Sequence, residues 1–475
     1  MKRKSLKYLI ILSISLILFY TQSFNNFFFQ DDFFNMKLAQ EHNLIDAFNI
    51  FKKPIMDFYF YRPFSTQLYW SAGQSLFGFS PQGYHVISFA FFLIGIFLVY
   101  KLALRILADE KAALLTTFFY AYSGSHFYRL FFLSQFQELS FAVFTFATFI
   151  LFLKKSAWTP VLFMLALTTK ETAVMIVPFL FFIALFMKGP KKDYLKISFY
   201  CFGVLAFYLY ARFFHFGFAT GETYAYDLTP KNIINNYFWY SLWSLGLPES
   251  FVNLQIFKFP TIINPKVFTA FESWGKETLA FFILFMLTIF VPVIRRLLKF
   301  DWRILFAAAL FIVFLVPVGF FPFHKFPYSL AVPLFGSSLI LGHAISNLGK
   351  KGLILICASY LILFFSAYQF NLSNHWARRK ANNARAVFAY FQKNHPQKPE
   401  KDIYFRNNLD PVCPVFRGIS SFSQEISYGI GDQAGLRLLY KNDDLHIYYE
   451  DVDKQKHLFS QKTLILDSRE FFKLE

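Results

Sequence analysis

The sequence predicts an all-α polytopic membrane protein of about 11 transmembrane helices, followed by a small C-terminal α/β extracytoplasmic domain. Hydrophobic residues make up 56% of the 475 residues, and charged residues only 16%. A soluble domain usually carries about 25% charged residues. The apolar residues also form long blocks separated by short polar loops, which indicates many membrane spans rather than one large core.

The first apolar block follows Met1-Lys2-Arg3-Lys4. No small-x-small cleavage site comes after this block, so we expect an uncleaved first span with its N-terminus in the cytoplasm. The predicted spans are residues 8–24, 84–100, 112–129, 134–153, 157–169, 172–187, 194–213, 277–298, 302–321, 327–346 and 352–370.

The basic loops give a test of this topology. With the N-terminus inside, every basic loop falls on the cytoplasmic side, as expected for membrane proteins. The formal net charge of +18 therefore fits a membrane protein facing anionic headgroups, and we expect no nucleic-acid partner. We expect a multi-pass protein of the bacterial plasma membrane. The basic loops are residues 101–111, 154–155, 188–192, 295–303 and 350–351.

The chain divides into a transmembrane region, residues 1–370, and an extracytoplasmic α/β domain, residues 371–475. In the second region we expect an amphipathic helix from His375 to about His395. A strand at 402–405, a hairpin formed by 436–440 and 445–449, and a strand at 462–466 should follow. The residue pattern of this domain contains no catalytic constellation.

Two adjacent carboxylates, Asp31 and Asp32, lie in a run of phenylalanines in the predicted external loop 25–82. Ionisable groups so close to lipid mark function by default, and a carboxylate can act as a general base. Three other roles are open: an exposed loop turn, capping of a following helix, or binding of a divalent metal. We favour no metal and no other cofactor, because no further acidic cluster lies near and the three cysteines show no metal-ligand spacing.

Two cations are candidates for binding a phosphate. Arg62 precedes Pro63 in the same loop, where it is either an interfacial arginine or a bidentate phosphate ligand. Lys170 lies at the tip of a short hairpin, with Glu171 as its partner or orienter. The 15 residues from Lys155 to Lys170 rise only about 22 Å as helix, less than the about 30 Å of the hydrocarbon core. The tip should therefore lie below the outer surface, where Lys170 either forms a buried ion pair or lines a water-filled cavity, and we favour the cavity.

Several further polar residues fall at the predicted outer ends of spans. Each can be an ordinary interface residue, but together they suggest a shared cavity that contacts sugar or phosphate. They are His85, His126, Arg129, Gln137, Glu138, His324 and Lys325.

These motifs, in this order, resemble those of the GT-C superfamily of membrane glycosyltransferases, and in particular the dolichyl-phosphate-mannose protein mannosyltransferase-like enzymes and their bacterial relatives. The resemblance covers most of residues 1–370. It rests on Asp31-Asp32, the Tyr-Arg-Pro-Phe segment at 61–64, the segment 76–85, the Thr-Lys-Glu-Thr hairpin at 169–172, and His-Lys-Phe-Pro-Tyr at 324–328.

The resemblance implies an enzyme that moves a sugar from a polyprenyl-phosphate-linked donor to an acceptor hydroxyl at the outer face of the membrane, with inversion at the sugar carbon. The base is then Asp31, or Asp32 if the register differs by one. It implies no metal. The acceptor is left open as a glycan, a lipid or a protein, and membrane lipids are further partners.

Two alternatives share the same membrane location. A transporter or flippase of lipid-linked sugars should show inverted repeats or paired broken helices, and the sequence shows neither. A surface-glycan polymerase or ligase would use the same donor but a sugar acceptor.

Overall fold

The computed structural model describes most of the chain. The described residues are 3–40, 60–186, 191–217, 225–256, 262–263, 274–299, 301–322, 324–397, 402–407, 421–453 and 463–472.

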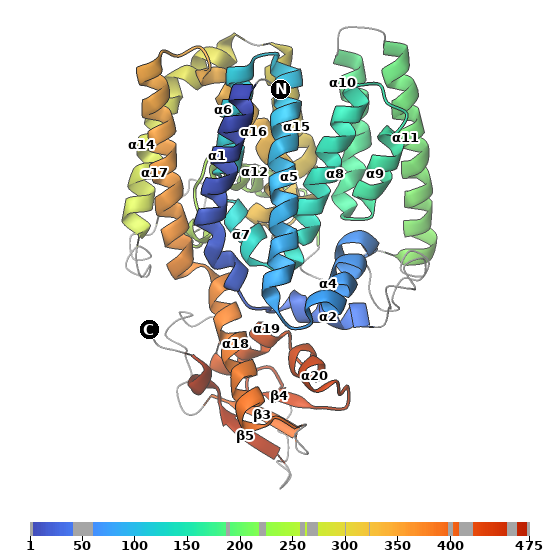
Figure 1. Ribbon diagram of the computed structural model, residues 1–475, viewed down its shortest axis with the longest axis vertical. Helices are drawn as coiled ribbons and strands as arrows, with labels where there is room; N and C mark the ends of the chain where they lie inside the picture. Colours follow the sequence, from blue (N-terminus) through green and yellow to red (C-terminus); the bar gives the residue numbers. More distant parts are fainter. Residues whose placement is uncertain are drawn as a thin grey trace.

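The membrane region is a bundle of helices, and each predicted span contains a helix (Figure 1). Within the described residues, seven helices are long and apolar enough to cross a membrane. The predicted fold class is thereby confirmed. The helices of the bundle are α1 (Arg3–Tyr20), α5 (Pro81–Leu107), α6 (Glu110–Ala121), α8 (Phe136–Leu153), α9 (Thr159–Leu167), α10 (Ile176–Phe186), α11 (Lys191–Ala211), α14 (Gly275–Leu298), α15 (Trp302–Gly319), α16 (Pro333–Ile345) and α17 (Lys350–Asn374).

The remaining predicted spans form helices that are shorter than a full crossing. The predicted span 112–129 is two helices, because α6 ends at Ala121 and α7 (His126–Phe131) begins after a Ser-Gly-Ser turn. Serine and glycine are poor helix formers, which explains the break. Helix α9 has nine residues and rises about 14 Å, which agrees with the short hairpin predicted before Lys170.

Small residues allow the central helices to approach closely. Gly336 of α16 lies against the backbone of Ala307 in α15, and Gly342 lies against Ala112 and Thr116 in α6. A Cβ atom at either glycine would collide with these neighbours. Helix α16 is therefore central to the bundle because its small residues let neighbouring backbones pack against it.

The basic loops meet one another at the ends of the helices. The Lys111 ammonium donates to the backbone oxygen of Leu348 (3.2 Å), and Arg303 Nε donates to the backbone oxygen of Ile106 (3.4 Å). Lys155 pairs with Asp193 at the start of α11 (3.1 Å). The N-terminus lies at this end of the bundle in Figure 1, opposite the C-terminal region.

Shorter elements connect the helices of the bundle. They are η1 (Thr21–Asn25), α2 (Asp31–Gln40), η3 (Pro63–Leu68), α4 (Tyr69–Phe77), α7, η4 (Leu133–Gln135), η5 (Glu171–Met175), η6 (Arg212–Phe216), α12 (Pro230–Ser244), η8 (Glu249–Leu254), the antiparallel pair β1 (Gln255–Ile256) and β2 (Ile262–Ile263), and η9 (Pro327–Leu330).

The C-terminal region is a small α/β unit below α2 and α4 (Figure 1). Its sheet has the strand order β4-β3-β5, and β3 is parallel to both neighbours, with Ile403 opposite Ile447 and Leu464. Its elements are α18 (Trp376–Asn394), β3 (Asp402–Arg406), α19 (Phe422–Ile430), α20 (Ala434–Tyr440), β4 (Ile447–Tyr449), β5 (Thr463–Asp467) and η11 (Ser468–Phe471).

The predicted hairpin in this region is wrong. Residues 436–440 belong to helix α20, and only the second half forms a strand, which pairs in parallel with β3. The Leu-Arg-Leu-Leu-Tyr run supplies good helix formers, and Lys441 takes a left-handed conformation (φ 49°) that ends the helix. The short polar turn thus connects a helix to a strand. Parallel pairing requires such a crossover.

Candidate active site

The segment that carries the two carboxylates is fixed to the membrane helices. Asn26 Nδ2 donates to the backbone oxygen of Phe131 in α7 (2.6 Å), and His85 of α5 contacts the backbone oxygen of Asn26 through Nε2 (3.0 Å). His85 is 2% exposed. His85 is therefore buried beneath the loop and supports it.

Asp32 is fully buried and its oxygens are occupied. Oδ1 accepts hydrogen bonds from Ser134 N–H (2.8 Å) and from the Ser134 hydroxyl (2.6 Å), and Oδ2 accepts from Phe29 N–H (3.1 Å). Burial raises the pKa of Asp32 to about 8, although these hydrogen bonds oppose the shift. The arrangement connects the start of α2 to η4, which is a structural role.

Asp31 differs from its neighbour because its side chain is exposed. Desolvation nevertheless raises the pKa of Asp31, while Lys380 and Arg62 act against the rise. A carboxylate that is accessible yet surrounded by protein is available to accept a proton from a bound molecule. Of the two candidate carboxylates, only Asp31 has this combination.

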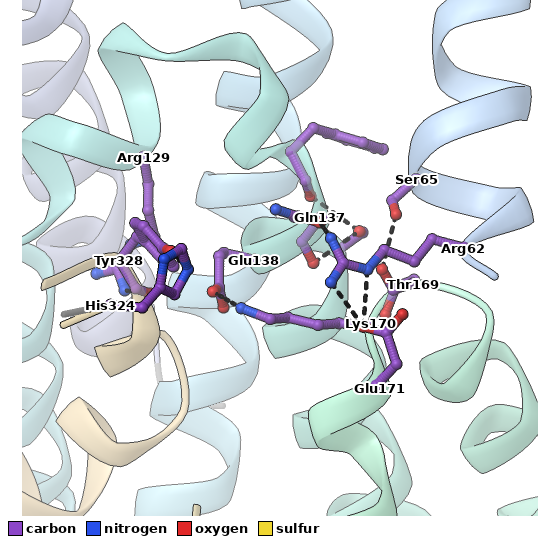
Figure 2. A network of polar contacts seen from close by, with 12 residues as sticks. Arg62, Ser65, Arg129, Gln137, Glu138, Thr169, Lys170, Glu171, His324 and Tyr328 are labelled. Carbon is purple, nitrogen blue, oxygen red and sulfur yellow. Dashed lines mark hydrogen bonds and ion pairs between the residues drawn. The ribbon is translucent and has the colours of Figure 1, made fainter. Parts of the chain in front are cut away.

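Arg62 is held by two side chains from different elements (Figure 2). Its Nε and NH2 atoms contact Glu171 Oε2 at 2.8 and 2.7 Å, and its NH1 atom donates to Gln137 Oε1. The guanidinium also lies over the Phe60 ring, with CZ 4.4 Å from the ring centroid. Glu171, expected as the partner or orienter of Lys170, forms its ion pair with Arg62.

Lys170 is buried and pairs with Glu138 of α8 (Figure 2). The Lys170 side chain is 8% exposed and that of Glu138 is 1% exposed, so of the two expected alternatives the structure shows the buried ion pair. The ammonium also lies 5.1 Å from the centroid of the Tyr328 ring. The segment around Arg62 lies against the same hairpin, since Phe64 N–H donates to the backbone oxygen of Thr168 (3.1 Å).

His126 and Arg129 form a second polar group, deeper in the protein. Arg129 donates to His126 Nδ1 (2.7 Å), to the Ser125 hydroxyl (3.2 Å) and to the backbone oxygen of Tyr328 (3.1 Å). Because Arg129 can only donate, His126 Nδ1 must accept, and His126 Nε2–H then donates to the backbone oxygen of Tyr120 (2.7 Å). Both residues are 1% exposed, so they support the site from behind.

His324 joins the first group through Tyr328 (Figure 2). Its Nε2 atom lies 2.8 Å from the Tyr328 hydroxyl. Burial, with the charges of Lys170 and Arg62, lowers the pKa of His324 to about 4. His324 is therefore a neutral hydrogen-bonding group at pH 7. The neighbouring Lys325 is half-buried, and burial lowers its pKa as well.

Among the residues that the structure describes, four cations and three carboxylates act on one another in this layer. The carboxylates are Glu138, Glu171 and Asp31. The cations are Arg62, Lys170, Arg129 and Arg212. The excess positive charge, beside an accessible carboxylate, suits a bound anion.

Sequence reasoning missed two participants and one pairing. The buried Arg212, which begins η6, acts on Glu171, and Lys380 of α18 acts on Asp31. Glu138 was among the expected polar groups, but not as the partner of Lys170. Glu138 had a weak signal as an acidic residue in an apolar helix. Lys380 had none, because it belongs to an ordinary basic helix far along the chain.

Within the described ranges, no group of three or more His, Cys, Asp or Glu side chains could hold a metal ion. The expectation that the reaction needs no cofactor stays a prediction.

Comparisons with known proteins find similarity among solved structures. No family model and no curated protein matches the chain. Among solved structures, the chain is similar to the Archaeoglobus fulgidus oligosaccharyltransferase, crystallised with a tethered acceptor peptide that contains an NVT sequon. The identity is 12% and the TM-score is 0.47; the match covers 94% of this chain and 64% of the oligosaccharyltransferase, so the chain spans less than two thirds of that protein.

Proposed function

We propose that the protein is a membrane glycosyltransferase that moves a sugar from a lipid-phosphate-linked donor to an acceptor hydroxyl. The observation that carries the proposal is the position of one accessible carboxylate, Asp31, beside a polar layer with excess positive charge. The motif order in residues 1–370, which resembles that of the GT-C superfamily, supports the same reaction.

The reaction divides between the two kinds of group. The acceptor hydroxyl oxygen attacks the anomeric carbon, and its proton goes to the Asp31 carboxylate. The bond from the anomeric carbon to the phosphate oxygen breaks, and its electron pair leaves with the lipid phosphate. Arg62 and Lys170 stabilise the charge that develops there. Attack opposite the leaving group inverts the configuration of the anomeric carbon.

Arg62 suits the phosphate role because its planar guanidinium already makes a paired contact with a carboxylate oxygen. The same donors can hold phosphate oxygens in a bidentate manner. Glu171 would then keep Arg62 oriented while the site is empty. His324, neutral at pH 7, suits hydroxyl groups of the sugar rather than the phosphate.

The proposed orientation follows the basic loops. These loops lie at the end of the bundle away from Asp31, and basic loops face the cytoplasm in membrane proteins. We therefore assign the site and the C-terminal region to the outer face of a bacterial plasma membrane. The donor class that fits is a polyprenyl-phosphate sugar.

The test is an assay of purified protein with a panel of polyprenyl-phosphate sugars and acceptors, with free polyprenyl phosphate measured by mass spectrometry. Asp31→Asn should fold and insert but lose transfer by about 100-fold or more. Asp193→Asn, which changes a carboxylate at the other end of the bundle, is the matched control and should keep wild-type turnover.

Unchanged turnover in Asp31→Asn would remove the proposed base. A transporter gives a different result, since it moves labelled donor across vesicles without releasing free polyprenyl phosphate.

A further inference from the structure

The loop that carries Asp31 contacts the C-terminal region as well as the membrane helices. Gln30 N–H donates to the backbone oxygen of Gly429 in α19 (3.0 Å). Phe33 stacks on Phe388 of α18, with ring centroids 5.0 Å apart and an interplanar angle of 12°. Lys37 pairs with Asp443 (3.0 Å). The segment from Gln30 to Lys37 is therefore part of an interface between the two regions.

The interface is close enough to require a glycine. Gly431 has φ +64°, and a Cβ atom on it would lie 2.7 Å from the backbone oxygen of Gln30. Gln30 itself has φ 51°, an uncommon conformation for a residue with a side chain. The backbone just before Asp31 thus has a defined conformation that the C-terminal region helps to maintain.

One cation of the C-terminal region reaches this loop. Lys380 Nζ donates to Gln30 Oε1 (3.2 Å), one residue before Asp31. The ammonium lies 4.8 Å from the centroid of the Trp376 ring and 4.8 Å from that of Tyr428. Two aromatic rings and one amide oxygen therefore fix the position of the charge.

Asp31 faces charged and titratable groups from four elements. Lys380 comes from α18, Arg62 from the segment before η3, Tyr128 from α7, and Asp32 from α2 itself. Lys380 in turn faces Glu425 of α19 and Arg379 of its own helix. Of the two cations that act on Asp31, Arg62 is already paired with Glu171. The other cation, Lys380, comes from the C-terminal region.

We propose that Lys380 is a positioning residue for the Asp31 carboxylate, so that the C-terminal region completes the active site. This inference rests on the proposed function for the meaning of Asp31, and goes beyond it by giving the C-terminal region a role. Lys380 holds Gln30 by a hydrogen bond and favours the ionised form of the adjacent carboxylate by its charge.

The positive charge of Lys380 determines the direction of its effect on the pKa of Asp31. Desolvation raises the pKa of Asp31, and Lys380 opposes that rise. Replacing Lys380 with a neutral residue therefore raises the pKa of Asp31 further. A larger fraction of Asp31 is then protonated at a given pH, and the protonated form cannot accept the proton of the acceptor hydroxyl.

The experiment uses the full-length protein in detergent and two measurements. The first is labelling of Asp31 with a water-soluble carbodiimide and glycine ethyl ester between pH 4 and 8, with the modified residue located by tandem mass spectrometry. It follows the titration of Asp31 without any turnover. The second is the pH dependence of sugar transfer.

Lys380→Met should raise the Asp31 titration midpoint by about one pH unit and move the acid limb of the rate profile in the same direction. Lys380→Arg keeps the charge, so both the titration midpoint and the acid limb should stay near their wild-type positions. Lys393→Met is the control: it removes an exposed cation from the same helix, about 20 Å further along. It should change neither measurement.

The outcomes separate the two proposals. A midpoint unchanged in Lys380→Met overturns the positioning role, even if activity falls. A raised midpoint together with wild-type turnover of Asp31→Asn supports the coupling of Lys380 to Asp31 and overturns the proposed base. Equal shifts in Lys380→Met and Lys393→Met would show a general charge effect and also overturn the positioning role.

Discussion

The two ends of the membrane bundle use charge in opposite ways. At the end with the basic loops, Lys155 and Asp193 pair with 31% and 55% of their side chains exposed. At the end with Asp31, Lys170 and Glu138 pair with 8% and 1% exposed. An exposed pair contributes little to stability, whereas a buried pair becomes costly when one partner is removed. The exposed charges at the first end suit the orientation of the protein in the membrane. The buried charges at the second end suit an active site.

Breaking the buried pair should have the largest effect. Glu138→Gln leaves the Lys170 ammonium buried without its partner, so the free energy of unfolding should fall by about 3–5 kcal/mol. Thermal melting in detergent measures the loss. Asp193→Asn breaks the exposed pair and should cost less than about 1 kcal/mol. Equal losses in the two variants would contradict the contrast between the two ends.

Changing the shape of a cation without its charge should have the next largest effect. Arg62→Lys removes the planar fork that contacts Glu171, and the KM for the lipid-linked donor should rise by about tenfold or more. Arg303→Lys makes the same change at the opposite end and should leave KM unchanged. An equal rise of the donor KM in both variants would contradict a specific role for the guanidinium at position 62.

The pH dependence sharpens the comparison within the site. The folded-state pKa of Asp31 is raised, so the ionised base is lost as pH falls through a value above the usual aspartate range of about 3.9. The rate should fall about tenfold for each pH unit below that midpoint. His324, with a pKa of about 4, is neutral throughout the range from pH 5 to 8. His324→Asn should therefore leave the acid limb in place; its disappearance would assign the limb to His324.

The smallest effect is expected at the basic end. Lys111→Met removes one exposed cation that donates to the backbone oxygen of Leu348, and stability should change by less than about 1 kcal/mol. Donor KM should stay at the wild-type value. A loss as large as that of Glu138→Gln in the melting experiment would show that this end also holds a buried, coupled charge.

Most of the membrane fold could be predicted because a long apolar block indicates a membrane-spanning helix without information from the rest of the chain. The spans at 84–100 and 277–298 needed no neighbour to be recognised as helices. The predicted hairpin at 436–449 failed because a short apolar run fits either a helix or a strand, and packing decides between them. The division at residue 370 stays a prediction.

The candidate site was predictable in part. Asp31, Arg62 and Lys170 stood out because each is an ionisable residue in apolar surroundings, and the structure brings all three into one polar layer. Their partners did not stand out. Asp31 and Asp32 also carry identical local signals, so the chain alone could not separate the accessible carboxylate from the buried one.

The sequence by itself determined that this is a helical membrane protein with acid and cations near one face, because hydrophobicity and charge act locally along the chain. Only the tertiary structure decided which carboxylate is exposed, that Glu138 pairs with Lys170, and that Lys380 lies beside the Asp31 loop. These relations join residues that are up to several hundred positions apart, and the packing of separate helices, rather than any local pattern, brings such residues together.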